Sequence, residues 1–494
     1  MKRALPVVLI FVWLLGATPR SAPVPPEKRS VTQHAVSIDG RRIPYTATAA
    51  TMLLRNEQQS PIASVFYTAY VATGDSSRRP ITFCFNGGPG SSSVWLRMGS
   101  IGPKRVQTPD AQASAPAPFV LTDNPYSLLD KTDLVFVDAV GTGFSRVAGK
   151  GDGKNFWGVD EDVRAFGQFI EQYVSRNARW NSPKFLFGES YGTARAANLV
   201  NYLQSRGMSF NGVILLSTVL NFESLIATDG GSDLPYIAFL PTQAATAWYH
   251  GKLPNKPADL DAFLRSVRAF AAGPYTQALM KGADLPPAER DAVAQRLHEY
   301  TGLSSVYILQ SQLRVPPGRF EKELYRNEGQ TIGRLDGRFV GYDVDRMGDS
   351  ADYDPSDVAM SGAFVGAFND YVRKDLGFKT NLEYFATNYP VVGRAWNWNR
   401  GPRSAPVATD VAGDLQNALV KNPHLHVLSA NGYFDFATPF FATEYTLNHL
   451  DLPSAIRSHI EFTYYQSGHM IYLNTPALAK FRSDLVRFYQ EAAP

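Results

Sequence analysis

The stretch FLFGESYG, from Phe185 to Gly192, joins a short apolar run to a serine that lies between two glycines. A pattern of small and apolar residues at helical spacing follows it. Gly188 and Gly192, two residues before and two after Ser190, permit a sharp strand-to-helix turn that raises the serine Oγ above the edge of a sheet. The start of the following helix can polarise a carbonyl group bound there. Ser190 is therefore predicted to be a catalytic nucleophile.

Several short runs around this motif are apolar throughout, which is typical of buried parallel strands. They are Ile81 to Phe85, Leu134 to Val137, Phe185 to Phe187 and Val213 to Leu216. A helical pattern, Val159 to Tyr173, lies between the second and the third run. Upstream, alternating apolar positions from Val36 to Tyr70 with a turn signal at Asp39-Gly40 predict antiparallel hairpins. This order of elements predicts an α/β fold that opens with β-hairpins.

From Leu220 to Ala405 the pattern changes to helices broken by proline and glycine, as in Leu260 to Phe270. This segment is predicted to be an inserted, mainly helical cap. Strands return at His426 to Ser429 and Ile460 to Tyr465, with helices around Thr443 to Leu450 and Ala477 to Tyr489. The expected organisation is a signal peptide at 1–22, the first part of the α/β domain at 23–219, the cap at 220–405 and the second part of the α/β domain at 406–494.

A nucleophilic serine needs a base, and a turn of this kind predicts the chain order serine, acid, histidine. His469 follows the strand Ile460 to Tyr465 in the loop SGHM, where its ring can reach the carboxyl edge of the sheet. Asp435 lies on the loop beyond the preceding strand, at the same edge. Ser190, Asp435 and His469 are therefore the predicted catalytic triad.

Other late histidines and acids fit these roles less well. His449 falls in a helical pattern and His459 at the start of a strand, where structural histidines are common. His424 and His426 share one strand face, but no third ligand accompanies them, so no metal site is expected. Three acids lie at the wrong end of a strand or beyond a helix and are expected on the solvated surface: Asp410, Asp414 and Asp451.

The loop NGGPGS, from Asn86 to Ser91, follows the strand that ends at Phe85 and matches the second requirement of acyl transfer. Its glycines let the backbone approach a reacting carbonyl. In hydrolases with a serine turn of this kind, the loop gives one N–H group to the oxyanion hole, and the residue after the serine, here Tyr191, gives the other. A phosphate-binding loop is the competing interpretation, but the lysine that a P-loop requires is absent.

Composition excludes several classes of protein. The 494 residues are 44% hydrophobic and 12% aromatic, so disordered and fibrous classes are excluded. With 48 basic and 45 acidic residues the net charge is only +3, and no basic run is interleaved with aromatic residues, so a nucleic-acid partner is not expected. A single cysteine, Cys84, can form neither an internal disulfide nor a cysteine-ligated metal site. No cofactor is expected.

The N-terminus has the pattern of a cleaved export signal, with Lys2 and Arg3, an apolar run from Leu5 to Leu15 and small residues up to Ala22. This run is shorter than the roughly 20 residues of a membrane-spanning helix, so cleavage is favoured over anchorage. No later segment is expected to span a bilayer. The mature protein is expected to be secreted or periplasmic.

Five motifs together resemble the serine carboxypeptidase family of α/β-hydrolases, and in particular its bacterial, disulfide-free members. They are FNGGPGSSS from Phe85, NPYSLLDKTDLVFVDAVGTGFSR from Asn124, FLFGESYG from Phe185, NGYFDFATP from Asn431 and SGHM from Ser467. The resemblance implies an α/β-hydrolase fold with the triad named above. It also implies roles for two further sets of residues: Gly88 and Tyr191 as oxyanion-hole donors, and Asn86, Gly87 and Glu189 as the groups that hold the terminal carboxylate of the substrate.

The sequence departs from the family pattern at two places. The family usually has a glutamate two positions before the Gly-Pro that corresponds to Gly102-Pro103, paired with the glutamate of the serine turn; this chain has Ser100 there. A family disulfide near the glycine motif is also absent, since Ser91 stands where cysteine is common. Glu189 is therefore expected to lack its carboxyl partner.

The function expected from these features is that of a serine carboxypeptidase acting on peptides through an acyl-enzyme at Ser190. An esterase or acyltransferase that uses the same triad is the first alternative. A noncatalytic protein that binds peptides in the same pocket is the second, although such a protein would not need an intact triad and oxyanion loop. Side-chain preference and oligomeric state are left open.

Overall fold

A computed structural model describes residues 22–227, 231–400 and 408–493 of this chain. The expected signal peptide at 1–22 therefore lies, apart from Ala22, outside the described residues. Within the three described ranges, no helix is both long and apolar enough to cross a bilayer.

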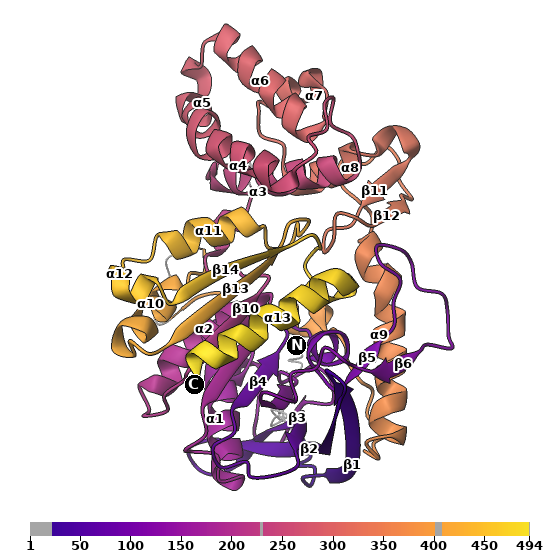
Figure 1. Ribbon diagram of the computed structural model, residues 1–494, viewed down its shortest axis with the longest axis vertical. Helices are drawn as coiled ribbons and strands as arrows, with labels where there is room; N and C mark the ends of the chain where they lie inside the picture. The colour runs from indigo at the N-terminus through magenta and orange to yellow at the C-terminus, as the bar shows by residue number, and fades with distance from the viewer. Residues whose placement is uncertain (1–21, 228–230, 401–407, 494) are drawn as a thin grey trace, which may run out of the picture.

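The centre of the molecule is a ten-stranded sheet with the strand order β1-β2-β3-β7-β4-β9-β10-β13-β14, and β8 pairs with β3 (Figure 1). Its strands are β1 (Arg29–Ile38), β2 (Arg41–Arg55), β3 (Pro61–Ala72), β4 (Ile81–Phe85), β7 (Asp133–Val137), β8 (Arg146–Val147), β9 (Lys184–Glu189), β10 (Gly212–Leu216), β13 (His426–Gly432) and β14 (Ile460–Tyr465). Two small hairpins stand apart: β5 (Lys104–Val106) with β6 (Leu121–Asp123), and β11 (Gln330–Ile332) with β12 (Val340–Tyr342).

The sheet divides into an antiparallel and a parallel half. The first three strands form a meander, and the predicted turn between β1 and β2 is present, with positive φ at Asp39 (49°) and Gly40 (74°). Strands β7, β4, β9, β10, β13 and β14 are parallel to one another. The residues of β4, β7, β9 and β10 are buried throughout, as expected for strands covered on both faces.

Helices cover both faces of the parallel half. One face packs against α9 and α13, and the other against α1, α2 and α10. The helices are α1 (Val159–Arg176), α2 (Tyr191–Gln204), α3 (Leu234–Tyr249), α4 (Leu260–Phe270), α5 (Thr276–Lys281), α6 (Pro287–Thr301), α7 (Ser305–Gln310), α8 (Pro317–Glu323), α9 (Pro355–Lys374), α10 (Ala412–Lys421), α11 (Phe440–Asn448), α12 (Ser454–Arg457) and α13 (Thr475–Ala492). The order of the strands and the two helical layers confirm the predicted α/β-hydrolase fold with N-terminal hairpins and a mainly helical insertion.

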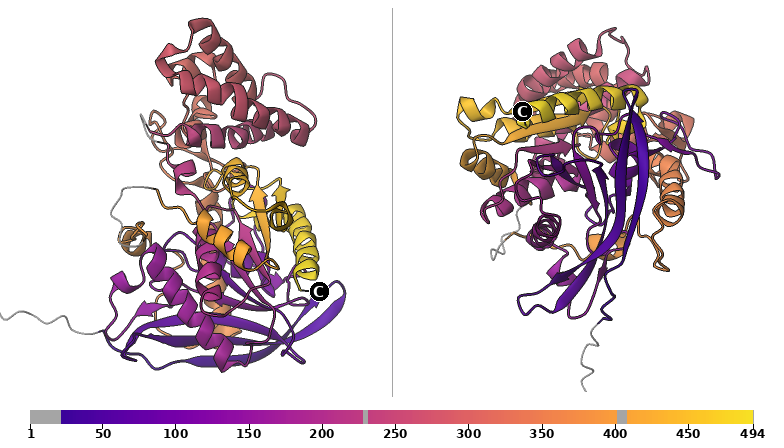
Figure 2. Two further views of the ribbon diagram at one scale, coloured as in Figure 1. Left: turned by 90° about the vertical axis from the view of Figure 1, so that its left-hand side faces the viewer. Right: turned by 60° about the horizontal axis from the view of Figure 1, so that its bottom comes forward.

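The helices of the insertion pack in two separate parts of the molecule. Helices α3 to α8 form a lobe that projects from one end of the molecule (Figures 1 and 2) and has its own apolar core. Residues of the loop after β13, among them Phe434 and Phe436, join that core and tie the lobe to the sheet. Helix α9, by contrast, lies beside the sheet and packs into its core through Phe364 and Phe368. The domain boundaries at 219/220 and 405/406 stay a prediction.

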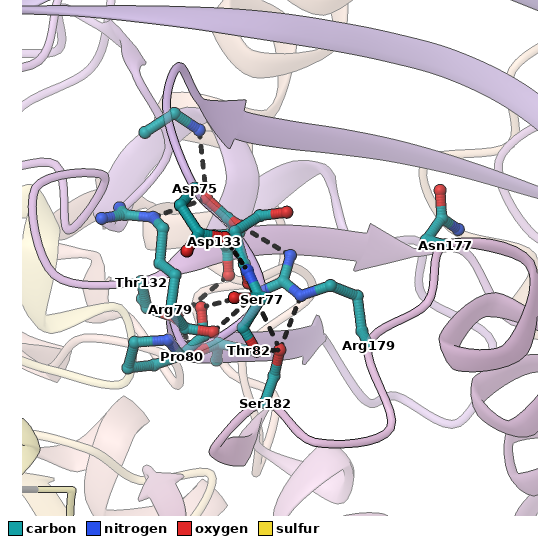
Figure 3. Close-up of polar contacts among 12 residues, drawn as sticks. Asp75, Ser77, Arg79, Pro80, Thr82, Thr132, Asp133, Asn177, Arg179 and Ser182 are labelled. Carbon is teal, nitrogen blue, oxygen red and sulfur yellow. Dashed lines mark hydrogen bonds and ion pairs between the residues drawn. The ribbon is translucent and has the colours of Figure 1, made fainter.

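A buried polar network fastens the amino ends of β7, β4 and β9 (Figure 3). The Asp133 carboxylate accepts hydrogen bonds from Arg79 Nε (2.8 Å) and from Arg179 Nη1 (2.7 Å). Arg179 also donates to the backbone carbonyl of Arg79 and to the hydroxyl of Ser182. The residues of the candidate site lie at the opposite, carboxyl ends of the parallel strands.

Candidate active site

Ser190 lies between β9 and α2 in a strained backbone conformation, with φ 62° and ψ −132°. The two glycines of the motif are required by close contacts. A Cβ on Gly188 would lie 2.0 Å from the carbonyl oxygen of Gly192, and a Cβ on Gly192 would lie 2.7 Å from that of Phe85. The Ser190 N–H donates to the Leu216 carbonyl on β10 (3.0 Å), which fixes the turn to the sheet. The predicted strand-to-helix turn is present, and Ser190 is half-buried at its tip.

Asp435 and His469 lie on the loops after β13 and β14 and contact each other. The His469 Nδ1–H donates to Asp435 Oδ2 at 2.8 Å, and both side chains are buried. The other oxygen, Asp435 Oδ1, accepts from the N–H groups of Ala437 (2.8 Å) and Thr438 (2.9 Å), and the Thr438 hydroxyl donates to Oδ2 (2.6 Å). These bonds hold the carboxylate in the orientation that leaves His469 Nε2 free to act on a proton.

The surroundings of His469 favour its protonated form. Burial lowers the pKa of the imidazole, but the charge and hydrogen bond of Asp435, with the charge of Glu189, raise it by more. The pKa of His469 therefore lies above its ordinary value. A base with a raised pKa accepts a proton from a serine hydroxyl more readily, provided that the pH is high enough to leave it neutral.

The loop Asn86 to Ser91 lies directly against the start of α2. A Cβ on Gly87 would be only 2.4 Å from the Tyr191 nitrogen. Gly88 has φ +104°, a conformation that favours glycine. Gly88 and Tyr191 line the same cavity as Ser190 and His469. Two backbone N–H groups at this point would match the requirement for stabilising an oxyanion.

Glu189 is buried next to Ser190, and only one of its carboxyl oxygens has a hydrogen-bond partner among the described residues. Its Oε1 accepts a hydrogen bond from the Tyr472 hydroxyl at 3.2 Å, whereas Oε2 has no hydrogen-bond partner among the described residues. Burial raises the pKa of Glu189 to about 7, although the charge of His469 and the bond from Tyr472 act against the rise. Ser100, the residue at the family glutamate position, forms no hydrogen bond with Glu189, and its own buried hydroxyl has none within the described part of the chain. Among the described residues, no carboxyl group is hydrogen-bonded to Glu189, and the phenol of Tyr472 donates to it instead.

A cavity of about 390 Å³ joins these groups. Of the predicted site residues, all but Asp435 line it, and Asp435 reaches it through His469. The sheet domain supplies Asn86, Gly87, Gly88, Glu189, Ser190, Tyr191 and His469. The insertion supplies Arg334, Asp354, Asp357, Met360 and Tyr389, which the sequence did not indicate.

A second group of residues that the sequence did not indicate lies in the insertion and contacts the loops of Asp435 and His469. The backbone carbonyl of Leu335 accepts from the His469 N–H (2.6 Å), and that of Arg334 accepts from the Phe436 N–H next to Asp435 (3.0 Å). The Asp336 carboxylate accepts from the Gly468 N–H at 3.2 Å. We call residues 333–338 the brace, because one segment holds the loops of both the acid and the base.

The brace is itself held by a buried ion pair. Arg338 Nη2 lies 2.6 Å from Asp336 Oδ2, and both side chains are only 2% exposed. Arg338 also donates to the Ser467 hydroxyl on the histidine loop (3.2 Å). Asp336 precedes Asp435 by 99 positions and stands in no motif with it, so spacing in the sequence carries no sign of this contact.

The histidines set aside in the sequence lie elsewhere. The rings of His426 and His459 stack on each other with centroids 4.5 Å apart, and His449 directly follows the last residue of α11. Across the described residues, no group of three histidine, cysteine or acidic side chains could hold a metal ion. Cys84 is buried in β4 as a free thiol.

Comparisons with known proteins give similarities over large parts of the chain. A model of the family described as serine carboxypeptidase matches residues 54–472. The serine carboxypeptidase S10 family member 1 of Dictyostelium discoideum is 26% identical over 200 residues, and serine carboxypeptidase-like 33 of Arabidopsis thaliana is 28% identical over 185 residues. These segments cover 40% and 37% of this chain. The chain spans less than half the length of these curated relatives, with 43% and 36% of them covered.

Solved structures give a likeness of fold only. The proline iminopeptidase of Mycobacterium smegmatis has 13% sequence identity and a TM-score of 0.36, with 94% of this chain and 99% of that chain covered. A putative aryl esterase from Burkholderia cenocepacia has 12% identity and a TM-score of 0.34, with 93% and 99% covered. At these scores the assignment of the fold rests on the strand order itself.

Proposed function

This chain belongs to the serine carboxypeptidase family, and from that membership we propose that it hydrolyses the C-terminal peptide bond of peptides through an acyl-enzyme at Ser190. The observation that carries the proposal is the 2.8 Å hydrogen bond between His469 and Asp435 beside the strained serine turn. A histidine oriented by a buried carboxylate, next to a serine in a shared cavity, is the arrangement that acyl transfer requires.

In the proposed reaction, the Ser190 Oγ attacks the carbonyl carbon of the last peptide bond while His469 Nε2 accepts the hydroxyl proton. The tetrahedral intermediate then collapses: the C–N bond breaks, and His469 gives its proton to the leaving amine. A water molecule, deprotonated by the same imidazole, attacks the resulting ester. The bond to Ser190 Oγ breaks, and the serine recovers the proton from His469.

Asp435 does not move a proton in this scheme. Its carboxylate, fixed by three further donors, keeps Nδ1 of His469 protonated and stabilises the imidazolium that forms after each proton transfer. The N–H groups of Gly88 and Tyr191 are proposed to bind the negative oxygen of the intermediate, where the start of α2 adds a favourable field.

The substrate class is proposed from a second set of groups. Asn86, Gly87 and Glu189 line the cavity on the nucleophile side and are proposed to bind the terminal carboxylate of the peptide. That contact would place the last peptide bond, rather than an internal one, at Ser190. An esterase or acyltransferase would use the same triad without needing this carboxylate contact, and a noncatalytic binding protein would need neither.

The test has two stages. First, a fluorophosphonate probe is added to the wild type and to Ser190→Ala. Labelling of the wild type alone supports a serine hydrolase, and no labelling of the wild type would leave only the binding protein. Second, N-acylated dipeptides with a free C-terminal carboxylate are compared with matched C-terminal amides and with simple esters. Release of the C-terminal amino acid from the free acids supports the carboxypeptidase, whereas turnover of esters alone would favour the esterase.

We also propose that the mature protein is exported, on the strength of the N-terminal pattern from Lys2 to Ala22. Expression of the full chain followed by cell fractionation and N-terminal sequencing tests this. An intact N-terminus on protein that stays in the cytoplasm would contradict it.

A further inference from the structure

An aromatic ring packs against Gly99, the residue before Ser100. Gly99 packs so closely against Tyr472 that a Cβ there would lie 2.5 Å from ring atoms Cδ2 and Cε2. Tyr472 belongs to the short helix Ile471–Leu473 that follows the histidine loop, and its side chain is fully buried. The absence of a side chain at position 99 therefore gives this ring its place.

The ring brings its hydroxyl to Glu189. The Tyr472 O–H donates to Glu189 Oε1 at 3.2 Å, and Oε2 is buried with no hydrogen-bond partner in the described ranges. Burial, with the negative charge of Glu189, raises the pKa of the phenol well above its ordinary value, so Tyr472 stays neutral over the working range of an enzyme. One oxygen of Glu189 is thus anchored, and Glu189 is among the residues that line the cavity.

We propose that Tyr472 is a positioning residue that anchors Glu189 in place of a second carboxyl group, so that Glu189 alone, in its protonated form, donates to the terminal carboxylate of the peptide. This inference rests on the proposed function, since it needs a substrate with a free carboxylate at that position. A protonated carboxyl has one O–H to donate, and an ionised one has none and repels the substrate.

The arrangement predicts a different pH response from that of two paired carboxyl groups. A close pair shares one proton and gives it up only in a second, coupled titration step. The Tyr472 phenol stays neutral in that range, and the hydrogen bond that it donates to Glu189 favours the ionised carboxylate. Free-carboxylate binding should therefore be lost in a single step as Glu189 ionises.

The charges around Glu189 come from several elements. His469 on the loop after β14 and Tyr472 lower the pKa of Glu189, whereas Asp435 on the loop after β13 raises it. The amide of Asn86 on the loop after β4 also lowers it slightly. The insertion contributes three further charged side chains to the same cavity: Arg334, Asp354 and Asp357. Burial outweighs the lowering effects, and the pKa of Glu189 is about 7.

The test compares kcat/KM from pH 5.5 to 9 for two matched N-acylated dipeptides, one with a free C-terminal carboxylate and one with a C-terminal amide. Their ratio cancels the titration of His469, which acts on both. In the wild type the ratio of free acid to amide should fall about tenfold between pH 6 and pH 8, as expected for one group with a pKa of about 7.

Tyr472→Phe removes the donor to ionised Glu189 while keeping the ring, so the pKa of Glu189 rises and the fall in the ratio moves to higher pH by about one unit. Glu189→Gln keeps an acceptor for Tyr472 and a permanent donor for the substrate, so its ratio should not depend on pH. Tyr371→Phe, in a buried tyrosine of α9 outside the cavity, is the matched control and should leave the ratio as in the wild type.

Two results would overturn the inference: a fall at the same pH in Tyr472→Phe as in the wild type, or a pH-dependent ratio that persists in Glu189→Gln. If Tyr472→Phe does not fold, Glu189→Gln still decides whether the protonated carboxyl is the donor. Failure of the proposed function looks different, because a wild type that is labelled at Ser190 but hydrolyses neither dipeptide is not a peptidase at all.

Discussion

The buried carboxyl groups at the two edges of the parallel sheet differ in how many of their oxygens are hydrogen-bonded. At the amino edge, Asp133 uses both carboxylate oxygens and Arg179 is bonded to the same carboxylate and to neighbouring carbonyls (Figure 3). At the carboxyl edge, Glu189 keeps one buried oxygen without a partner among the described residues, and Ser190 faces a cavity. A network in which every group is bonded has no polar atom left for a ligand, whereas one with an unbonded group can bind a ligand.

The carboxyl edge also contains both kinds of buried group, those with all hydrogen bonds satisfied and those without. The ion pair between Asp336 and Arg338 is as fully bonded as the amino-edge network, and it supports the backbone that holds the loops of Asp435 and His469. The groups proposed to react are therefore few, and the polar groups that support them have their own hydrogen bonds satisfied. Substitutions at the amino edge should therefore change stability alone, whereas substitutions at the carboxyl edge should change kcat, stability or both.

The largest effect is expected at the nucleophile. Ser190→Ala should lower kcat by roughly 10⁴- to 10⁶-fold, because it removes the atom that forms the acyl-enzyme. Ser190→Gly should be equally inactive, yet more stable to urea unfolding than Ser190→Ala by about 1 kcal/mol, since glycine tolerates φ 62° without strain. Retention of more than a tenth of the wild-type rate in Ser190→Ala would show that this edge does not carry the chemistry.

The acid of the triad should come next. Asp435→Asn keeps the shape of the side chain but removes its charge, so kcat should fall by about 10³- to 10⁴-fold. The double variant with Ser190→Ala should be no slower than Ser190→Ala alone, because the two residues act on one proton transfer. Additive losses in the double variant would mean that the residues work independently.

The comparison of the two edges is tested most directly by removing one buried carboxylate at each edge. Asp133→Ala leaves the buried Arg179 without its carboxylate partner, so it should lower the free energy of unfolding by about 3–5 kcal/mol. Asp336→Ala leaves the buried Arg338 with only the half-exposed Asp110, so its loss should be smaller, about 2–4 kcal/mol. Only Asp336→Ala should also lower kcat, by about 10- to 100-fold, because it loosens the histidine loop. Asp349→Ala, which breaks an exposed ion pair with Arg319, should change stability by under about 1 kcal/mol.

Equal losses of kcat in Asp133→Ala and Asp336→Ala, measured on folded protein below the unfolding temperature, would contradict the distinction between the edges. Normal kcat in both would show that the brace supports the fold but not the triad.

The smallest effect is expected in the pH dependence of stability. Because the folded protein holds the pKa of His469 above its unfolded value near 6.5, the protonated ring stabilises the fold below that pH. This contribution is lost as the pH rises through the folded pKa. Urea unfolding at pH 5.5 and pH 8.5 should therefore show a larger deficit for His469→Gln, relative to the wild type, at the lower pH. A deficit that grows with pH would mean that the pKa of His469 is lowered rather than raised.

Much of the fold could be predicted because its signals are local. The strands Ile81–Phe85 and Ile460–Tyr465 have the predicted bounds, and the hairpin turn at Asp39-Gly40 is present. The apolar run Ile81–Phe85 is buried throughout, as expected of a strand inside a parallel sheet, whereas Ile460–Tyr465 lies at the edge of the sheet and is only partly buried. The serine turn is largely local as well, since Gly188 is required by a contact with Gly192 inside the motif, although Gly192 is required by a contact with Phe85 of β4.

The insertion could not be predicted in the same detail. Its helices were expected, but the packing of α9 into the sheet core, apart from the lobe of α3 to α8, has no local signature. An amphipathic pattern predicts that one face of a helix is buried, but it does not predict which element packs against that face. The contribution of Arg334 and Asp357 to the cavity depends on that placement.

The sequence by itself determined the sheet, the serine turn and the candidate triad, because backbone geometry and residue order restrict these features to a few positions. Only the tertiary structure decided what surrounds them: the brace that contacts the loops of Asp435 and His469, and the phenol of Tyr472 that reaches Glu189 from 283 positions further along the chain. Hydrogen bonds between distant segments depend on three-dimensional packing, and no spacing along the chain encodes their distances.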